Sequence, residues 1–402
     1  MFRKGFVYIV LNYIIQFANI ILNLVLMRYL NSYLLGDLSI AKTWQQLVDY
    51  SHFGARFSLD RYVPIVEAEE KKKLVATVLF STLSGALLVF FIGIFFNGSN
   101  VTVLILTACG IFISLSNVLK AYLRAVNKID EMLKLVFWNQ FIPVLIPLIT
   151  FIITHEFLVY LLTSLFCYFA AITILLYRER EVVFCINLYT AKKIIKKIAL
   201  PSFLLFVNSL FIFIYLVSDR FFIDYTLGRA KLGDYSIITF AFSALMVIPA
   251  TCAELLFVRI MQQSVHNGKR IFYKESAMLL SITIIGVVIA NIVMQYFVEY
   301  FTNYGYLVSK MHFATLAVIP FALTSIYYHV MNGLDLRKEM ILVNASVCLV
   351  LCIYYTIPLF ADIKVTLIYY IYAKIATGWL IFLGYLLFIL FKRPAKSSKD
   401  VV

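Results

Sequence analysis

The sequence predicts an all-α integral membrane protein, and three observations support this fold class. Hydrophobic residues make up 63% of the 402 residues and charged residues only 14%, against roughly 45–50% and about 25% in soluble domains. Long apolar stretches recur along the whole chain. Short clusters of Lys and Arg separate these stretches. Because a soluble fold has no place for so much apolar surface, we expect about twelve transmembrane helices of about 20 residues each.

Each apolar stretch is long enough to cross a bilayer with some tilt. The expected transmembrane helices, in chain order, are 6–30, 35–56, 74–96, 101–123, 133–154, 157–177, 199–222, 235–258, 276–298, 311–331, 340–360 and 366–390. Of the 35 Lys and Arg residues, 27 fall in the segments on one side of these helices and 6 on the other. This bias predicts that both termini are cytoplasmic, and it explains the net charge of +14 without nucleic-acid binding.

The segment 178–198 separates the sixth and seventh expected helices. Its basic pairs Lys192-Lys193 and Lys196-Lys197 alternate with apolar residues, Ile194, Ile195 and Ile198, which predicts an amphipathic helix lying on the inner membrane surface. We therefore expect three parts: an N-terminal six-helix bundle (1–177), this cytoplasmic linker (178–198) and a C-terminal six-helix bundle (199–402).

A short motif recurs at half the chain length. Leu-Gly-Asp-Leu-Ser-Ile at 35–40 reappears as Leu-Gly-Asp-Tyr-Ser-Ile at 232–237. Both copies lie at the expected outer end of an even-numbered helix. Six helices return the chain to the same side of the membrane, so this recurrence predicts two parallel six-helix repeats. Such an architecture is typical of transporters, with the substrate site between the halves.

Polar residues form one face of the second expected helix. At spacings of three and four they are Ser39, Lys42, Gln45, Gln46, Asp49, His52 and Arg56. Charged side chains are costly inside a bilayer, so we interpret this face as the lining of a wet cavity. A structural Lys42–Asp49 pair, or a Lys42 side chain that extends to the membrane surface, is the alternative. The first helix carries a milder stripe of Asn12, Gln16, Asn19 and Asn23, which either lines the cavity or joins helices by hydrogen bonds.

Two further basic residues are candidates for the site. Lys374 lies in the last expected helix, ten residues beyond Lys364 and so about 15 Å from the outer mouth. That depth favours an inward-facing, functional lysine over one that reaches the surface. Arg220 follows Asp219 late in the seventh helix, either in the outer half of the cavity or at the membrane interface. We expect Asp49 and His52 to be candidates for ion coupling.

The sequence carries no pattern of a soluble enzyme. It has no phosphate-binding Gly-rich loop with Lys, no spaced group of metal ligands and no nucleophile elbow. We therefore expect neither catalysis, nor ATP hydrolysis, nor a metal or other cofactor.

Several short segments together carry a resemblance to a known family. They are Arg28-Tyr29-Leu30, Leu35-Gly36-Asp37, Tyr122-Leu123-Arg124-Ala125, Asn127-Lys128, Leu200-Pro201, Ser218-Asp219-Arg220-Phe221-Phe222-Ile223 and Leu232-Gly233-Asp234-Tyr235-Ser236. These segments resemble the bacterial polysaccharide-export and O-antigen flippases of the multidrug/oligosaccharidyl-lipid/polysaccharide (MOP) exporter superfamily. The resemblance covers nearly the whole chain, although each motif alone is loose. It implies a flippase that moves undecaprenyl-pyrophosphate-linked oligosaccharide repeat units to the outer leaflet of the bacterial inner membrane, for O-antigen, lipopolysaccharide or a related polysaccharide. Membrane lipids and other polysaccharide-assembly proteins are the implied partners.

Three alternatives stay open at the level of sequence. A small-molecule exporter of the same superfamily is the first, although its usual cationic cargo fits a cavity with Lys42 and Lys374 less well than an anion does. A major-facilitator transporter also has six plus six helices, but Tyr62-Val63-Pro64 ends the weak likeness to its signature loop. A polysaccharide polymerase or ligase is the third, and the short outer connections, such as 97–100, argue against it.

Overall fold

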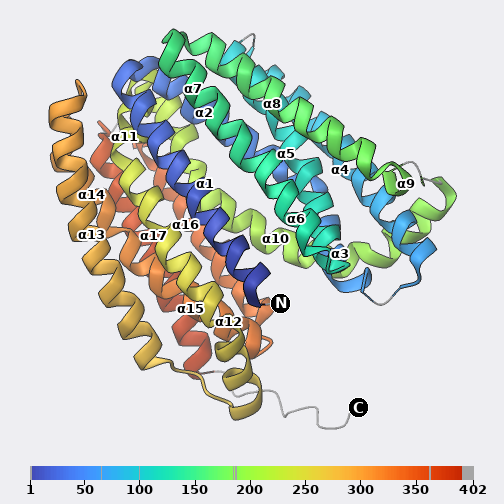
Figure 1. Cartoon of the computed structure of the whole chain (residues 1–402). Helices are drawn as coiled ribbons and strands as arrows, with labels where there is room; N and C mark the ends of the chain where they lie inside the picture. Colours follow the sequence, from blue (N-terminus) through green and yellow to red (C-terminus); the bar gives the residue numbers. More distant parts are fainter. Residues whose placement is uncertain are drawn as a thin grey trace. The chain divides into compact units, whose positions relative to one another are not determined.

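The structure is a computed structural model, which describes the backbone of residues 2–64, 66–98, 100–183, 185, 188–361 and 364–391 (Figure 1). Every regular element in these ranges is helical. Among the described residues, eleven helical segments are long and apolar enough to cross a membrane. Large apolar side chains on their surfaces are exposed, including Phe95 at 84%, Phe166 at 68% and Phe360 at 89%. Only lipid can cover such surfaces favourably, so the chain is a multi-pass membrane protein.

The second of the twelve expected helices is the one missing from these eleven spans. Its counterpart, α2 (Ser32–Asp49), carries three charged residues in 18, which makes it too polar to be recognised by composition. The helix also ends at Asp49 rather than near residue 56. Phe53 and Gly54 adopt left-handed backbone conformations, with φ of 44° and 87°. These residues close the turn η1 (Tyr50–His52), and a new helix, α3 (Ala55–Tyr62), follows.

Gly54 is required here by both its backbone and its surroundings. A Cβ at this position would lie 2.3 Å from the Ser202 carbonyl oxygen. We expect Gly54→Ala to lower the free energy of unfolding by ~1–2 kcal/mol for the left-handed conformation and by a further ~1–3 kcal/mol for the overlap. Thermal unfolding of the purified protein in detergent measures the effect.

Gly268→Ala is the matched control for this substitution. Its backbone is also left-handed, with φ of 59° and ψ of 17°, but nothing lies within 4 Å of its added Cβ. It should therefore lose only the backbone contribution. Equal losses of stability in the two variants would contradict the role assigned to the Ser202 contact.

The chain divides into two compact units, Met1–Leu210 and Phe211–Val402. The division falls within α10 (Leu188–Leu227), which begins in the first unit and ends in the second. The side chains of residues 188–201 lie outside the described part of the structure. They include the basic residues of the expected amphipathic linker, so its position on the membrane surface remains a prediction.

The first unit is organised around α5. This helix packs against α2, α4 and α8, and its Leu119 joins Val48 and Val78 in a fully buried apolar core. The remaining elements of this unit are α1 (Phe2–Tyr29), α4 (Ala68–Asn97), α5 (Val101–Ala125), α6 (Ile129–Val136), η2 (Phe137–Phe141), α7 (Ile142–Thr154), α8 (Phe157–Arg178) and α9 (Arg180–Val183).

The second unit is organised around α15. This helix packs against α12, α13 and α17, while α14 packs against α11. The elements of this unit after α10 are α11 (Arg229–Leu245), α12 (Val247–Asn267), α13 (Tyr273–Phe301), η3 (Gly305–Leu307), α14 (Val308–Leu316), α15 (Val318–Gly333), α16 (Arg337–Ala361) and α17 (Leu367–Phe391).

The two copies of the Leu-Gly-Asp motif occupy equivalent places in the two units. Each copy begins at the fourth residue of its helix, α2 or α11. Asp37 accepts a hydrogen bond from Asn100, the residue that caps α5, at 2.9 Å. Asp234 accepts one from Tyr306, in the turn before α14, at 2.9 Å. Both aspartates thus tie their helix to the start of the helix that it packs against. A repeat requires such a correspondence, but the two-repeat relation itself remains a prediction.

Candidate functional site

The polar residues singled out in the sequence fall into two clusters, one in each compact unit. The first unit holds the residues of α1, α2 and η1, and the second holds Lys374 and Arg220. Most of these side chains are partly or fully buried, although Gln16 and Gln46 are exposed. Each cluster is described below within its own unit.

The asparagines of α1 bond chiefly to their own helix. Asn12, Asn19 and Asn23 each donate from Nδ2 to the carbonyl oxygen four residues earlier, at 2.7–3.0 Å. Of the asparagines on this stripe, and within the described residues, only Asn23 also bonds to a second helix. Its Oδ1 accepts a hydrogen bond from Lys42 Nζ of α2 at 2.9 Å. The structure therefore brings Lys42 and Asn23 together, while Asn12 and Asn19 each bond to their own helix.

The ion-pair partner of Asp49 is Arg56, whereas the sequence suggested Lys42. Arg56 Nη1 lies 2.9 and 3.0 Å from the two carboxylate oxygens of Asp49. Asn117 of α5 donates a further hydrogen bond to Asp49 Oδ1 at 2.9 Å. The side chains of Arg56 and Asp49 are 22% and 26% exposed. The turn η1 makes this pairing possible, since it folds α3 back so that Arg56 reaches the end of α2.

His52 is buried in the same turn. Its Nδ1 accepts a hydrogen bond from the Gly54 backbone N–H at 2.9 Å. Its ring packs edge-on against Phe57 at 5.2 Å between centroids and against Phe206 at 6.3 Å. Since one ring nitrogen is engaged in closing the turn, His52 supports the backbone that positions Arg56. Its ion-coupling role stays a prediction.

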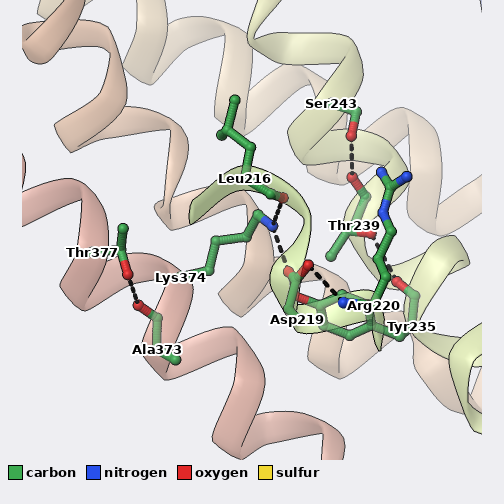
Figure 2. A network of polar contacts seen from close by, with 9 residues as sticks. All are labelled: Leu216, Asp219, Arg220, Tyr235, Thr239, Ser243, Ala373, Lys374 and Thr377. Carbon is green, nitrogen blue, oxygen red and sulfur yellow. Dashed lines mark hydrogen bonds and ion pairs between the residues drawn. The ribbon is translucent and has the colours of Figure 1, made fainter. Parts of the chain in front are cut away.

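The second cluster is built on a buried ion pair between α10 and α17 (Figure 2). Lys374 Nζ lies 2.5 Å from Asp219 Oδ2 and also donates to the Leu216 carbonyl oxygen at 2.9 Å. The two side chains are only 7% and 2% exposed. Tyr235 of α11 donates its hydroxyl to the same Asp219 oxygen at 2.5 Å. Three helices therefore meet at one carboxylate.

Aromatic rings surround this ion pair. Lys374 Nζ lies 5.4 Å from the centroid of the Phe242 ring, a distance at which a cation is attracted to the ring face. Tyr370, four residues before Lys374 on α17, shares a hydrogen bond of 2.7 Å with Thr226 of α10. Tyr355 of α16 packs against Tyr370 at 5.3 Å. The pair is thus held in a dry, aromatic-lined environment where its mutual attraction is strong.

Arg220 is half-buried beside the pair. Its backbone N–H donates to Asp219 Oδ1 at 2.9 Å, and Figure 2 shows its guanidinium pointing away from that carboxylate. Asp219 therefore accepts from Lys374, Tyr235 and the Arg220 backbone. The structure brings Lys374 and Arg220 to the same carboxylate, but the Arg220 side chain itself is directed elsewhere.

Sequence reasoning missed Asn117 as a member of these clusters, and it missed the partners of Tyr235 and Arg56. Asn117 does not stand out by depth or spacing, and Tyr235 was noted only as part of the recurring motif at 232–237. Arg56 was part of the polar face, but its pairing with Asp49 depends on the turn at Gly54. The glycine next to the polar face was the available signal for that turn.

The chemistry of the clusters is that of binding and charge compensation. They offer amide and hydroxyl groups, the ion pairs Arg56–Asp49 and Lys374–Asp219, the Arg220 guanidinium, and Lys42 hydrogen-bonded to Asn23. Among the residues that the structure describes, no group of three or more His, Cys, Asp or Glu side chains is placed to hold a metal ion. Such an arrangement suits the recognition of a polar, charged molecule.

No family model matches the chain, and no curated protein matches it in sequence. In three dimensions it is similar to MATE transporters. The MATE transporter ClbM in complex with Rb+ aligns with a TM-score of 0.54 and 12% identity, over 97% of this chain and 93% of that chain. A mutant MATE protein aligns at 0.53 and 13%, over 93% and 95%.

An outward-facing multidrug resistance MATE family transporter of the MOP superfamily aligns with a TM-score of 0.51 and 14% identity. The match covers 89% of this chain and 84% of that chain. At these identities the likeness is one of fold. The chain therefore has the all-helical fold of MATE transporters, as the resemblance to the MOP superfamily predicts.

Proposed function

We propose that this chain is a flippase that moves undecaprenyl-pyrophosphate-linked oligosaccharide repeat units from the inner to the outer leaflet of the bacterial inner membrane by alternating access. The observation that carries the proposal is a MATE-like fold over nearly the whole chain, combined with buried charged side chains on its helices. Charged residues within transmembrane helices commonly mark substrate or ion pathways. The flippase-like motifs quoted above narrow the class of transporter.

The substrate class follows from the chemistry that each part of the molecule requires. A pyrophosphate needs cations, and Lys42, Lys374 and Arg220 are the candidates. Sugar hydroxyls need amide and hydroxyl partners, and Asn12, Gln16, Asn19, Asn23 and Gln46 provide amides. The polyprenyl tail needs only lipid, and it would stay in the bilayer while the polar part passes.

The ion pairs fit a mechanism in which substrate and carboxylate compete for the same cation. Asp219 holds Lys374 at 2.5 Å, and Asp49 holds Arg56 at 2.9 Å. An entering pyrophosphate would replace Asp219 as the partner of Lys374, and Asp219 would retain its bond from Tyr235. Asp49 and His52 remain our candidates for coupling this exchange to an ion.

A small-molecule exporter of the same superfamily is the second candidate. The pairing of Lys374 with Asp219 favours it, because a compensated lysine attracts an anion less strongly than the sequence alone indicated. The solved neighbours include a multidrug resistance transporter. The polymerase or ligase alternative has no comparable structural support.

Export by living cells distinguishes the two candidates. The chain is expressed in bacteria that make lipid-linked repeat units but lack their own flippase. We expect surface polysaccharide to reappear and inner-leaflet lipid-linked repeat units to fall. In a parallel strain without drug exporters, we expect no change in ethidium efflux. The test is repeated in several hosts that make different repeat units. If ethidium efflux returns but surface polysaccharide returns in none of them, the flippase proposal is contradicted and the exporter is supported.

A further inference from the structure

Two adjoining cavities lie at one end of the first unit, where α5 and α8 end and α6 begins. The larger has a volume of ≈ 570 Å³ and the smaller ≈ 200 Å³. Glu131, Arg178 and Glu179 line both of them, so the two cavities lie side by side in one depression of the surface. Neither cavity includes a residue of the two polar clusters described above.

The larger cavity is a charged mouth at the helix ends. Cations and anions are equally represented around the combined opening, namely Lys128, Lys134 and Arg178 with Asp130, Glu131 and Glu179. Arg178 lies 2.6 Å and Lys134 3.2 Å from the carboxylate of Glu131. The side chains of these three residues are 46%, 56% and 33% exposed, so water and ligands reach them. The mouth has separate positive and negative groups and no net formal charge.

The smaller cavity continues from the mouth along an apolar groove. Leu123, Leu135, Ala171, Ile174 and Trp138 line it. Trp138 is 53% exposed, as expected of an aromatic side chain at a membrane interface. It belongs to η2, a π-helical turn in which the Ile142 backbone N–H bonds to the Phe137 carbonyl.

The π-helical turn has a local cause in the sequence. Pro143 has no N–H, so the regular helical bonding pattern cannot continue through it. The turn widens the helix beside α8, where the groove lies. π-helical turns of this kind are frequent at functional sites.

We propose that this depression binds a phospholipid with a zwitterionic, phosphoethanolamine headgroup. Its phosphate lies against Arg178 and Lys134, its ammonium group lies against Glu131 and Glu179, and one acyl chain follows the groove past Trp138. The equal numbers of cations and anions favour a headgroup with both charges over a purely anionic one. The position at helix ends places the mouth at the level of lipid headgroups, and the apolar groove has the direction of a chain entering the bilayer.

Native mass spectrometry of the full chain in detergent tests this assignment. Phosphatidylethanolamine and phosphatidylglycerol with identical acyl chains compete for the protein. We expect phosphatidylethanolamine to be preferred about fivefold, the factor that one additional interfacial charge contact provides. Free phosphoethanolamine at the same concentration should not displace the lipid, because it has no chain for the groove.

Two variants with matched controls locate the site. Glu131→Gln removes the carboxylate expected to hold the ammonium group, and it should reverse the preference toward phosphatidylglycerol. Glu156→Gln, the same change at the other end of α8, should leave the preference unaltered. Trp138→Ala should weaken both lipids equally, whereas Phe166→Ala, at a lipid-exposed position of α8 outside the groove, should weaken neither. Within the described residues, Glu131 pairs with Arg178 and Lys134, which are 46% and 56% exposed. Ion pairs near the surface contribute little to stability, so the Glu131 variant should fold.

Several results would overturn the proposal. Equal binding of the two lipids to the unmodified protein would indicate an ordinary annular lipid. An unchanged preference in Glu131→Gln would place any specific lipid elsewhere. Free phosphoethanolamine could instead displace the bound lipid as effectively as a second lipid does. That result would show that the site binds a headgroup or phosphate and has no groove for an acyl chain.

Discussion

Lys374→Met is expected to destabilise the protein strongly and to abolish transport. The substitution keeps the volume of the side chain but leaves Asp219 as a buried, uncompensated carboxylate next to Tyr235. Breaking a buried ion pair from one side typically costs ~3–5 kcal/mol. We therefore expect lower protein abundance in the membrane and a lower unfolding temperature in detergent. Lys364→Met, at an exposed position just before α17, is the control and should change neither.

The double variant Asp219→Asn with Lys374→Met separates stability from function. It removes both charges and retains a partner for the Tyr235 hydroxyl. Since neutral residues of similar volume replace buried ion pairs with little loss, we expect its unfolding temperature to return close to that of the unmodified protein. If the lysine serves as a partner for the substrate pyrophosphate, transport should remain absent in this stable protein.

Reversal of the pair gives the opposing test. Asp219→Lys with Lys374→Asp restores charge compensation but moves the cation to α10. If either double variant regains both stability and transport, the pair serves only to join helices. Lys374 would then not belong to the substrate site. Substitution by Arg at Lys374 should retain more transport than substitution by Gln, since charge matters more than hydrogen bonding for an anion.

The membrane fold was accessible from the sequence because it depends on composition. Runs of apolar residues must become helices in lipid, where backbone groups have no water to bond. The same reasoning failed at α2, since its end is fixed by local backbone geometry. The left-handed residues Phe53 and Gly54 stop the helix at Asp49, and polarity along the helix carries no information about that turn.

The candidate site was predicted in part for a similar reason. Depth alone indicated that Lys374 needs water, a counter-charge or a substrate. Its observed partner, Asp219, lies 155 residues earlier in the chain, so no local pattern joins the two. Asn12 and Asn19 show a second limit of prediction from sequence. Their spacing marked one helix face correctly, but asparagine in a helix readily bonds to the carbonyl four residues earlier, and spacing cannot distinguish this bond from a contact with substrate.

Lys42→Met is expected to abolish transport with a smaller loss of stability than Lys374→Met. Lys42 is half-buried, and its Nζ donates to the amide oxygen of Asn23 at 2.9 Å. The sequence suggested Asp49 as the partner of Lys42, but Asp49 forms an ion pair with Arg56 at 2.9 Å. Loss of a hydrogen bond from a charged donor to a neutral acceptor costs about 1.5–3 kcal/mol at most, and Asn23 retains its bond to the Asn19 carbonyl.

The functional consequence should appear in each protein molecule that remains folded and inserted. If Lys42 attracts the pyrophosphate, its removal should lower the transport rate per protein molecule at least tenfold, since an ion contact in a desolvated site is worth more than ~1.4 kcal/mol. Lys42→Arg should keep part of the rate, and Asn23→Ala, which removes the amide but keeps the cation, should keep most of it. Accumulation of lipid-linked repeat units, normalised to membrane-inserted protein, measures the rate. Equal loss in Asn23→Ala and Lys42→Met would indicate that the α1–α2 hydrogen bond matters rather than the charge, and normal transport in Lys42→Met would remove the lysine from the substrate path.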